Sequence, residues 1–213
     1  FYIDKISIEN SRLDIHHFEN SNKDFGLDLK QMTFSGFNVT VEDLRAYTDT
    51  VQMNINHLSL TDKSGFTLKD FSSGLHLSKQ QLYFDDVDFT TARSKMAFRK
   101  IHFDVDSFKD FGQGGILSKV KMNIGCDKAE LFLDELGYFA KVFENLDNKI
   151  ELAGAFYGTI ANLNARNLEI RYGENTLLKG KFDIIGLPDS KSTFLIFDTR
   201  EFKTTTEEIN SFK

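Results

Sequence analysis

The feature that most constrains the fold of this chain is a spacing of apolar residues that alternates, skips one residue and then resumes. In the stretch "MAFRKIHFDV", residues 96–105, the apolar side chains include Met96, Phe98, Ile101 and Phe103. Alternation places side chains on one face of a β-strand, and one extra residue turns the next pair to the opposite face. A β-bulge or a sharp bend at the skip absorbs the extra residue and keeps all of them on one face.

The same spacing recurs along the chain, so it predicts a sheet made of similar strands. Further copies, complete or nearly so, occupy residues 32–39, 53–60, 82–89, 163–170 and 182–187. The intervening residues are polar, which gives each strand one apolar and one solvated face, as in antiparallel sheets. Turn-forming stretches such as "TDKSG" at 61–65 and "RYGEN" at 171–175 separate the segments. We predict an all-β antiparallel fold of about a dozen strands, continuous over residues 1–213.

The pattern leaves two arrangements of the apolar face open. A second sheet covers it in a β-sandwich, whereas an elongated, curved sheet folded like a taco leaves it as a groove. The chain has 22 Phe and no Trp, and Phe carries no polar group, which suits a dry surface. A groove without polar anchors suits the acyl chains of phospholipids. The candidate lining residues are Leu82, Phe84, Val87, Phe89, Met96, Phe98, Ile101 and Phe103.

One segment has helical rather than strand spacing. In residues 132–146 the apolar positions follow a period close to 3.6, which predicts one short amphipathic helix at about 134–145. Asp134 is the expected N-cap, and Gly137 weakens the helix. Its apolar residues, Leu136, Phe139 and Phe143, either pack on the dry face of the sheet or line a groove there. A second helix is expected to start at Thr206.

The search for catalytic, cofactor and metal sites gives no candidates. The net charge is −6 and no basic stripe is present, which argues against nucleic-acid binding. The triplet "DFG" occurs twice without the other kinase motifs, and a loose match to a calcium loop has Gly115 where the bidentate Glu is required. Cys126 is the only cysteine and is expected to be a buried, inert thiol. We therefore expect no enzyme activity.

Two stretches resemble a known protein family. The run 60–96 contains "KSGF" at Lys63–Phe66 and "T-x-x-S" at Thr91–Ser94, and the run 151–188 contains spaced glycines around "L-x-I-x-Y-G" at 168–173. In this order, with "LDELGYF" at 133–139 between them, they resemble the TamB-like translocation and assembly module proteins of the AsmA superfamily. The resemblance covers most of the chain.

The resemblance implies a function that the spacing alone does not. Such proteins are anchored in the inner membrane by an N-terminal helix, cross the periplasm of diderm bacteria and meet an Omp85-type barrel partner in the outer membrane through their C-terminal part. They are implicated in phospholipid transport toward the outer membrane and in outer-membrane biogenesis. We expect this chain to be an internal periplasmic segment without catalytic residues. The alternative is a scaffold that assists insertion of outer-membrane β-barrel proteins by strand pairing and carries no lipid.

Overall fold

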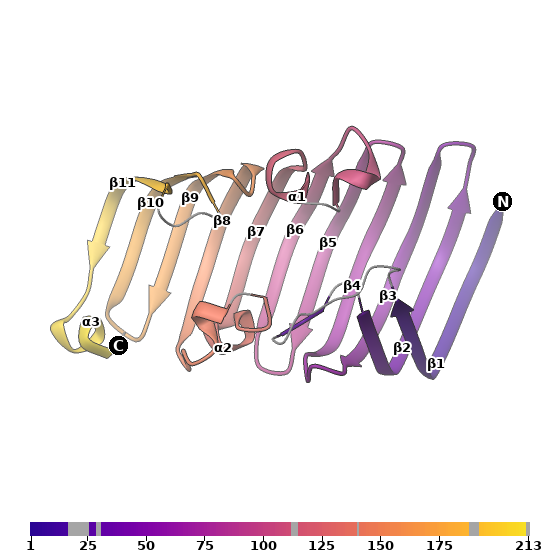
Figure 1. The fold of residues 1–213 in the computed structure, drawn as a ribbon, viewed down its shortest axis with the longest axis horizontal. Coiled ribbons are helices and arrows are strands. Elements are labelled where there is room, and N and C mark those ends of the chain that lie inside the picture. Colours follow the sequence, from indigo (N-terminus) through magenta and orange to yellow (C-terminus); the bar gives the residue numbers. More distant parts are fainter. Residues whose placement is uncertain (17–25, 29–30, 112–114, 140, 188–191, 212–213) are drawn as a thin grey trace.

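The computed structural model places the chain in a single antiparallel sheet whose strands follow one another in chain order (Figure 1). It describes residues 1–16, 26–28, 31–111, 115–139, 141–187 and 192–211. The strands are β1 (Tyr2–His16), β2 (Gln31–Ala46), β3 (Thr50–Asp62), β4 (Thr67–Ser78), β5 (Gln81–Thr91), β6 (Lys95–Asp104), β7 (Lys121–Phe132), β8 (Lys149–Thr159), β9 (Asn162–Tyr172), β10 (Thr176–Ile185) and β11 (Phe194–Lys203).

The sheet is open, with β1 and β11 at its two edges. The predicted all-β antiparallel class is confirmed, and of the two arrangements that the sequence left open the single curved sheet is the one found, because all eleven strands belong to one sheet. With neighbouring strands about 4.8 Å apart, the sheet extends about 48 Å across its strands. The chain therefore forms one elongated, open sheet rather than a β-sandwich.

Left-handed backbone conformations mark the predicted skips. Gly36, Asp86 and Asn167 have φ angles of 57°, 47° and 50°, and each lies directly before the apolar residue that resumes the pattern. Ring contacts show that the facing is restored, since Phe71 of β4 contacts both Phe84 and Phe89, which lie on opposite sides of the skip in β5, at 6.1 and 6.2 Å between ring centroids. The bulge interpretation is thus confirmed at these strands.

A substitution at Asp86 tests the role of the bulge in stability. We expect Asp86→Val to lower the free energy of unfolding by about 1–2 kcal/mol, because a β-branched residue strongly disfavours the left-handed conformation. Asp88→Val on the same strand is the matched control, since Asp88 is also exposed and lies outside the left-handed region, where valine favours the strand. Urea unfolding measures both. Equal losses in the two variants would contradict the prediction.

The helical segment differs from the expected single helix. The structure has a one-turn helix α2 (Leu133–Leu136) and a 3-10 turn η2 (Lys141–Phe143) in place of a helix over 134–145. Phe132 is the N-cap and provides no side-chain cap, whereas Asp134 lies inside α2 and pairs with Arg93. Gly137 ends α2. A helix this short gains too little from its own hydrogen bonds to continue through a glycine without apolar packing along its whole length.

The remaining helical turns lie at the ends of strands. The 3-10 turn η1 (Phe108–Phe111) and the short helix α1 (Gly115–Ser118) lie between β6 and β7, and α3 (Thr206–Ser211) follows β11, as the sequence predicted for Thr206. In Figure 1, α1 lies at the upper end of the strands, whereas α2 and α3 lie at the lower end. These connections project from the two long rims of the sheet.

Candidate functional site: an apolar trough

The strand register joins the apolar side chains of successive strands into continuous rows. Directly opposed residues in neighbouring antiparallel strands point to the same face. The upper row contains Val51, Leu77, Leu82, Phe103, Met122, Gly158, Leu163, Ile184 and Leu195. The middle row contains Met53, Leu75, Phe84, Ile101, Ile124, Phe156, Ala165, Phe182 and Phe197. The lower row contains Phe71, Phe89, Met96, Ala129, Leu152, Ile170, Leu178 and Phe202.

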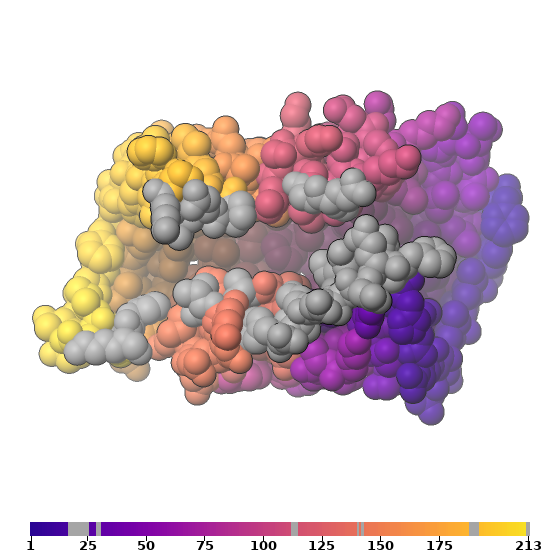
Figure 2. Space-filling view, viewed as in Figure 1, coloured from indigo at the N-terminus to yellow at the C-terminus, as the bar shows by residue number. Residues whose placement is uncertain are grey.

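These rows run across the strands, along the long axis of the molecule. The upper and middle rows extend from β3 to β11, and the lower row from β4 to β11, without a charged or hydrogen-bonding side chain in any of them. The space-filling view shows a hollow along this axis between the two rims (Figure 2). We call this face, with its three rows, the trough.

The eight predicted lining residues lie together on the trough face. They form four directly opposed pairs between β5 and β6: Leu82 with Phe103, Phe84 with Ile101, Val87 with Phe98, and Phe89 with Met96. Val87 is 2% exposed, whereas the other seven are half-buried. The predicted residues therefore belong to the trough wall, and their role in lipid binding stays a prediction.

Small and medium residues line the bend between the middle and lower rows. Cys126 is opposed to Phe98 and is 3% exposed, and the neighbouring Ala129 and Leu168 are also buried. Burial raises the pKa of the Cys126 thiol to about 11, so the thiol is protonated and poorly nucleophilic at neutral pH. The prediction of a buried cysteine is confirmed, and its chemical environment is that of a packing residue.

The opposite face of the sheet carries ion pairs between strands. Arg99 pairs with Asp127 at 2.6 Å, and Lys149 pairs with Glu130 at 2.9 Å. Hydrogen bonds from Lys128 and Lys149 lower the pKa of Glu130 to about 2, so its carboxylate stays charged in the physiological range. This face is solvated, and the contrast with the trough reproduces the two-sided pattern of the sequence.

The three apolar residues of the predicted groove helix lie in three different parts of the 133–147 connection. Leu136 ends α2 and Phe143 lies in η2, both half-buried, while Phe139 lies between the two turns and is 59% exposed. The three residues therefore do not form one apolar stripe. Phe139 nevertheless reaches the apolar face, where its ring contacts Phe66 edge-on at 5.9 Å between centroids.

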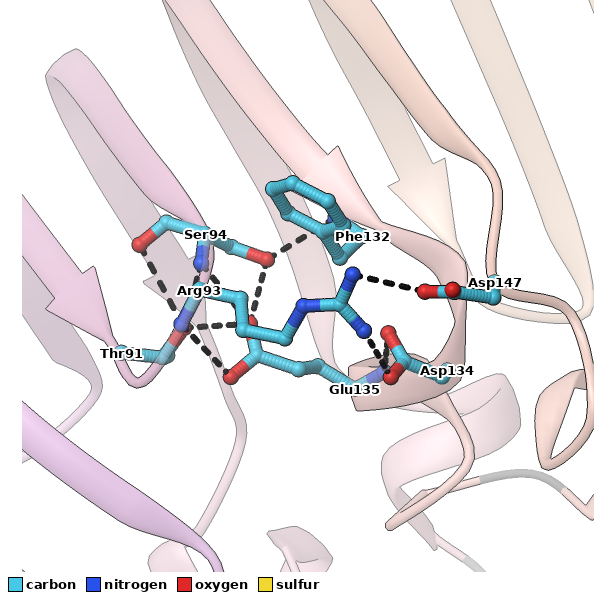
Figure 3. A network of polar contacts seen from close by, with 7 residues as sticks. All are labelled: Thr91, Arg93, Ser94, Phe132, Asp134, Glu135 and Asp147. Atoms are coloured by element: carbon cyan, nitrogen blue, oxygen red, sulfur yellow. Dashed lines mark hydrogen bonds and ion pairs between the residues drawn. The ribbon is translucent and has the colours of Figure 1, made fainter.

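A buried carboxylate fastens α2 to the turn between β5 and β6 (Figure 3). The Glu135 side chain accepts hydrogen bonds from the Thr91 hydroxyl at 2.5 Å, the Ser94 hydroxyl at 2.5 Å, the Ser94 amide at 2.9 Å and the Arg93 amide at 3.1 Å. The Ser94 hydroxyl also accepts from the Phe132 amide at 3.0 Å. The hydroxyls of Thr91 and Ser94 and the amides of Arg93 and Ser94 thus bind the Glu135 carboxylate, and we call this group of donors the Glu135 cradle. The cradle holds the start of the 133–147 connection against the sheet.

Several residues at the site were missed by the sequence-based predictions. Phe111 packs on Phe103, and Tyr138 packs on Phe66, both from connections outside the strands. No local period marks these residues, because their partners lie in other strands. Glu135 was also missed, although the "T-x-x-S" stretch that binds it was recognised as a motif.

Comparisons with known proteins give no identification. No family model, no curated protein and no solved structure matches this chain. In the described part of the chain, no group of three or more His, Cys, Asp or Glu side chains is arranged to hold a metal ion. None of the helices in the described ranges has the length and hydrophobicity that a bilayer crossing requires. The trough is therefore the feature of the molecule from which a function can be inferred.

Proposed function

We propose that the chain is a segment of a membrane-bridging protein that shields phospholipid acyl chains in its trough. The three continuous apolar rows carry this proposal. An apolar surface of this extent is unfavourable in water and calls for an apolar occupant. Contacts with such rows are non-directional, so an acyl chain can slide along them without breaking specific hydrogen bonds.

The dimensions of the rows fit acyl chains lying along the trough. From β3 to β11 a row extends about 38 Å at about 4.8 Å per strand. The hydrocarbon core of a bilayer is about 30 Å thick, so the chains of one leaflet extend about 15 Å. The trough accommodates more than one lipid in succession, with headgroups in solvent. We place this activity in the periplasm, with an inner-membrane anchor and an Omp85-type outer-membrane partner supplied by other parts of the protein, as the family resemblance suggests.

Photo-crosslinking in cells tests the proposal directly. A photoreactive residue replaces Phe84 or Phe98 in the full-length protein, and Asp85 and Arg99 on the opposite face serve as controls. We expect phospholipid adducts from the two trough positions and none from the controls. Absence of lipid adducts at Phe84 and Phe98 in a folded protein would contradict the proposal.

The edge strand β11 favours a second candidate function, a scaffold for other β-strands. It pairs on one side with β10, and its first residues carry large exposed side chains, among them Phe194, Leu195 and Ile196 at 69%, 63% and 56% exposure. An edge strand with an exposed apolar stretch, here residues 194–197, and without proline favours addition of another strand. If this is the function, proline substitutions in β11 abolish activity in outer-membrane protein assembly, while charged substitutions in the trough leave it unchanged.

A further inference from the structure

The two connections that flank β7 approach the trough from opposite rims. The upper lobe, residues 105–111 and 115–120, carries η1 and α1, and the lower lobe, residues 133–139 and 141–148, carries α2 and η2. Val120 and Leu133, the residues next to the two ends of β7, are 1% and 5% exposed, so each lobe is anchored in packed structure. In Figure 2 the two lobes face each other across the hollow.

The upper lobe covers part of the upper row. The Phe111 ring packs edge-on against Phe103 at 5.7 Å between centroids, and Phe108 stacks on Phe111 at 5.9 Å. Phe103 lies on the trough face, because it is directly opposed to Leu82 in β5 and to Met122 in β7. The upper row is therefore occupied at β6 by side chains of the protein itself.

The lower lobe covers the lower edge of the trough at β3–β5. The Tyr138 ring contacts Phe66 edge-on at 5.6 Å, and the Tyr138 carbonyl accepts a hydrogen bond from the Leu27 amide at 2.9 Å. Leu27 and Phe66 belong to one buried cluster, against which Phe71 and Phe89 of the lower row pack. Residues 26–28 and the lower lobe, which are distant in sequence, are thus hydrogen-bonded to each other above the lower row.

We infer that the lobes form a waist over β4–β6 where, among the residues that the structure describes, the middle row is the path left between the upper row covered at β6 and the lower row covered at β4 and β5. This inference rests on the proposed function and specifies its ligand. A flexible, unbranched acyl chain follows one row of side chains, whereas a rigid fused-ring lipid needs the width of neighbouring rows. The waist therefore selects flexible chains, and Phe111 and Phe139 are the residues that set its width.

Photolabelling with two lipids of different shape tests the waist. The probes are palmitate and cholesterol, each bearing a diazirine, and mass spectrometry compares labelling of β5 and β6, under the waist, with labelling of β9 and β10. In the wild-type protein we expect palmitate to label both regions, and the sterol to label β5 and β6 at least about tenfold less than palmitate does, because forcing a bulky group into packed space is costly.

Two substitutions open the waist from opposite sides. Phe139→Ser removes a ring that is 59% exposed, so we expect the sheet to stay folded, and Phe111→Ala removes the ring that covers Phe103. We expect either variant to raise sterol labelling of β5 and β6 several-fold, toward that of palmitate, with palmitate labelling unchanged. Tyr47→Ser is the matched control, since Tyr47 is an aromatic residue of similar exposure, 63%, but lies outside the rows, in the turn between β2 and β3. The control should retain the wild-type discrimination.

The outcomes separate the waist from the proposed function. Palmitate labelling of the wild-type trough combined with unchanged sterol exclusion in both folded variants would refute the waist alone. Equal labelling of β5 and β6 by both probes in the wild-type protein would also refute it. No labelling of the trough by palmitate would overturn the proposed function, and the waist with it. Circular dichroism and thermal unfolding establish that each variant is folded.

Discussion

Replacing Phe84 by glutamate is expected to abolish phospholipid crosslinking in the trough while the sheet stays folded. Phe84 lies in the middle row, directly opposed to Leu75 and Ile101, and is half-buried. A carboxylate there remains in contact with water when the trough is empty, but an acyl chain would remove that water, which is very unfavourable for an unpaired charge. We expect at least about a hundredfold weaker lipid occupancy, equivalent to about 3 kcal/mol.

Neighbouring positions provide controls for this expectation. Tyr83→Glu places the same charge on the opposite face of β5 and should leave crosslinking unchanged, whereas Phe84→Leu keeps the row apolar and should retain most of it. Val87→Glu should instead unfold the protein, because Val87 is 2% exposed and water cannot reach a charge there. The measurement is the yield of lipid adduct from a photoreactive residue at Phe98. A folded Phe84→Glu variant with wild-type yield would refute the role of the middle row.

The features of the fold that depend only on neighbouring residues in the sequence could be predicted. Alternation and the single-residue skip depend only on neighbouring residues, so the strands and the bulges at Asp86 and Asn167 could be inferred from the sequence. The openness of the sheet could not, because a sandwich and an open sheet have the same alternation along each strand. The choice depends on what lies above the apolar face, and a strand pattern carries no information about that.

The trough was predictable in part for the same reason. The eight lining residues could be found because β5 and β6 are consecutive and joined by a short turn, which fixes their register. The full rows required the register of every strand pair, and the waist required contacts between connections and distant strands. Glu135 lies 44 residues from Thr91, and only the strand order brings α2 beside that turn. The helix prediction failed because periodicity ignores the break at Gly137.

Removing the Glu135 carboxylate is expected to cause the largest loss of stability that a single polar substitution produces in this protein. Glu135 is 8% exposed and accepts four hydrogen bonds, two from hydroxyls and two from backbone amides. Glu135→Ala leaves these donors without their acceptor in a largely buried place. Because hydrogen bonds to a charged group contribute about 1.5–3 kcal/mol each and water replaces some of them, we expect a loss of about 3–5 kcal/mol.

The C-terminal helix supplies a comparison for this effect. Glu208 of α3 accepts hydrogen bonds from the Glu174 and Asn175 amides and from the Thr176 hydroxyl, in the turn between β9 and β10. The hydrogen bond from Thr176 lowers the pKa of Glu208, so its contribution to stability is present at neutral pH and is lost as the pH falls through that lowered pKa. Glu208 is half-buried and its hydrogen bonds to the Glu174 and Asn175 amides lie at the surface, so water can replace the lost acceptor in Glu208→Ala.

The two substitutions should therefore differ strongly in urea unfolding at neutral pH. We expect Glu208→Ala to shift the unfolding midpoint slightly and Glu135→Ala to shift it severely, with Glu135→Gln intermediate because its amide oxygen still accepts. Limited proteolysis should also cut the lower lobe of Glu135→Ala before the strands, because the Glu135 cradle fixes the base of that lobe to the sheet. Similar midpoints for Glu135→Ala and Glu208→Ala would mean that the lower lobe is held by its apolar contacts with Phe66 rather than by the Glu135 cradle.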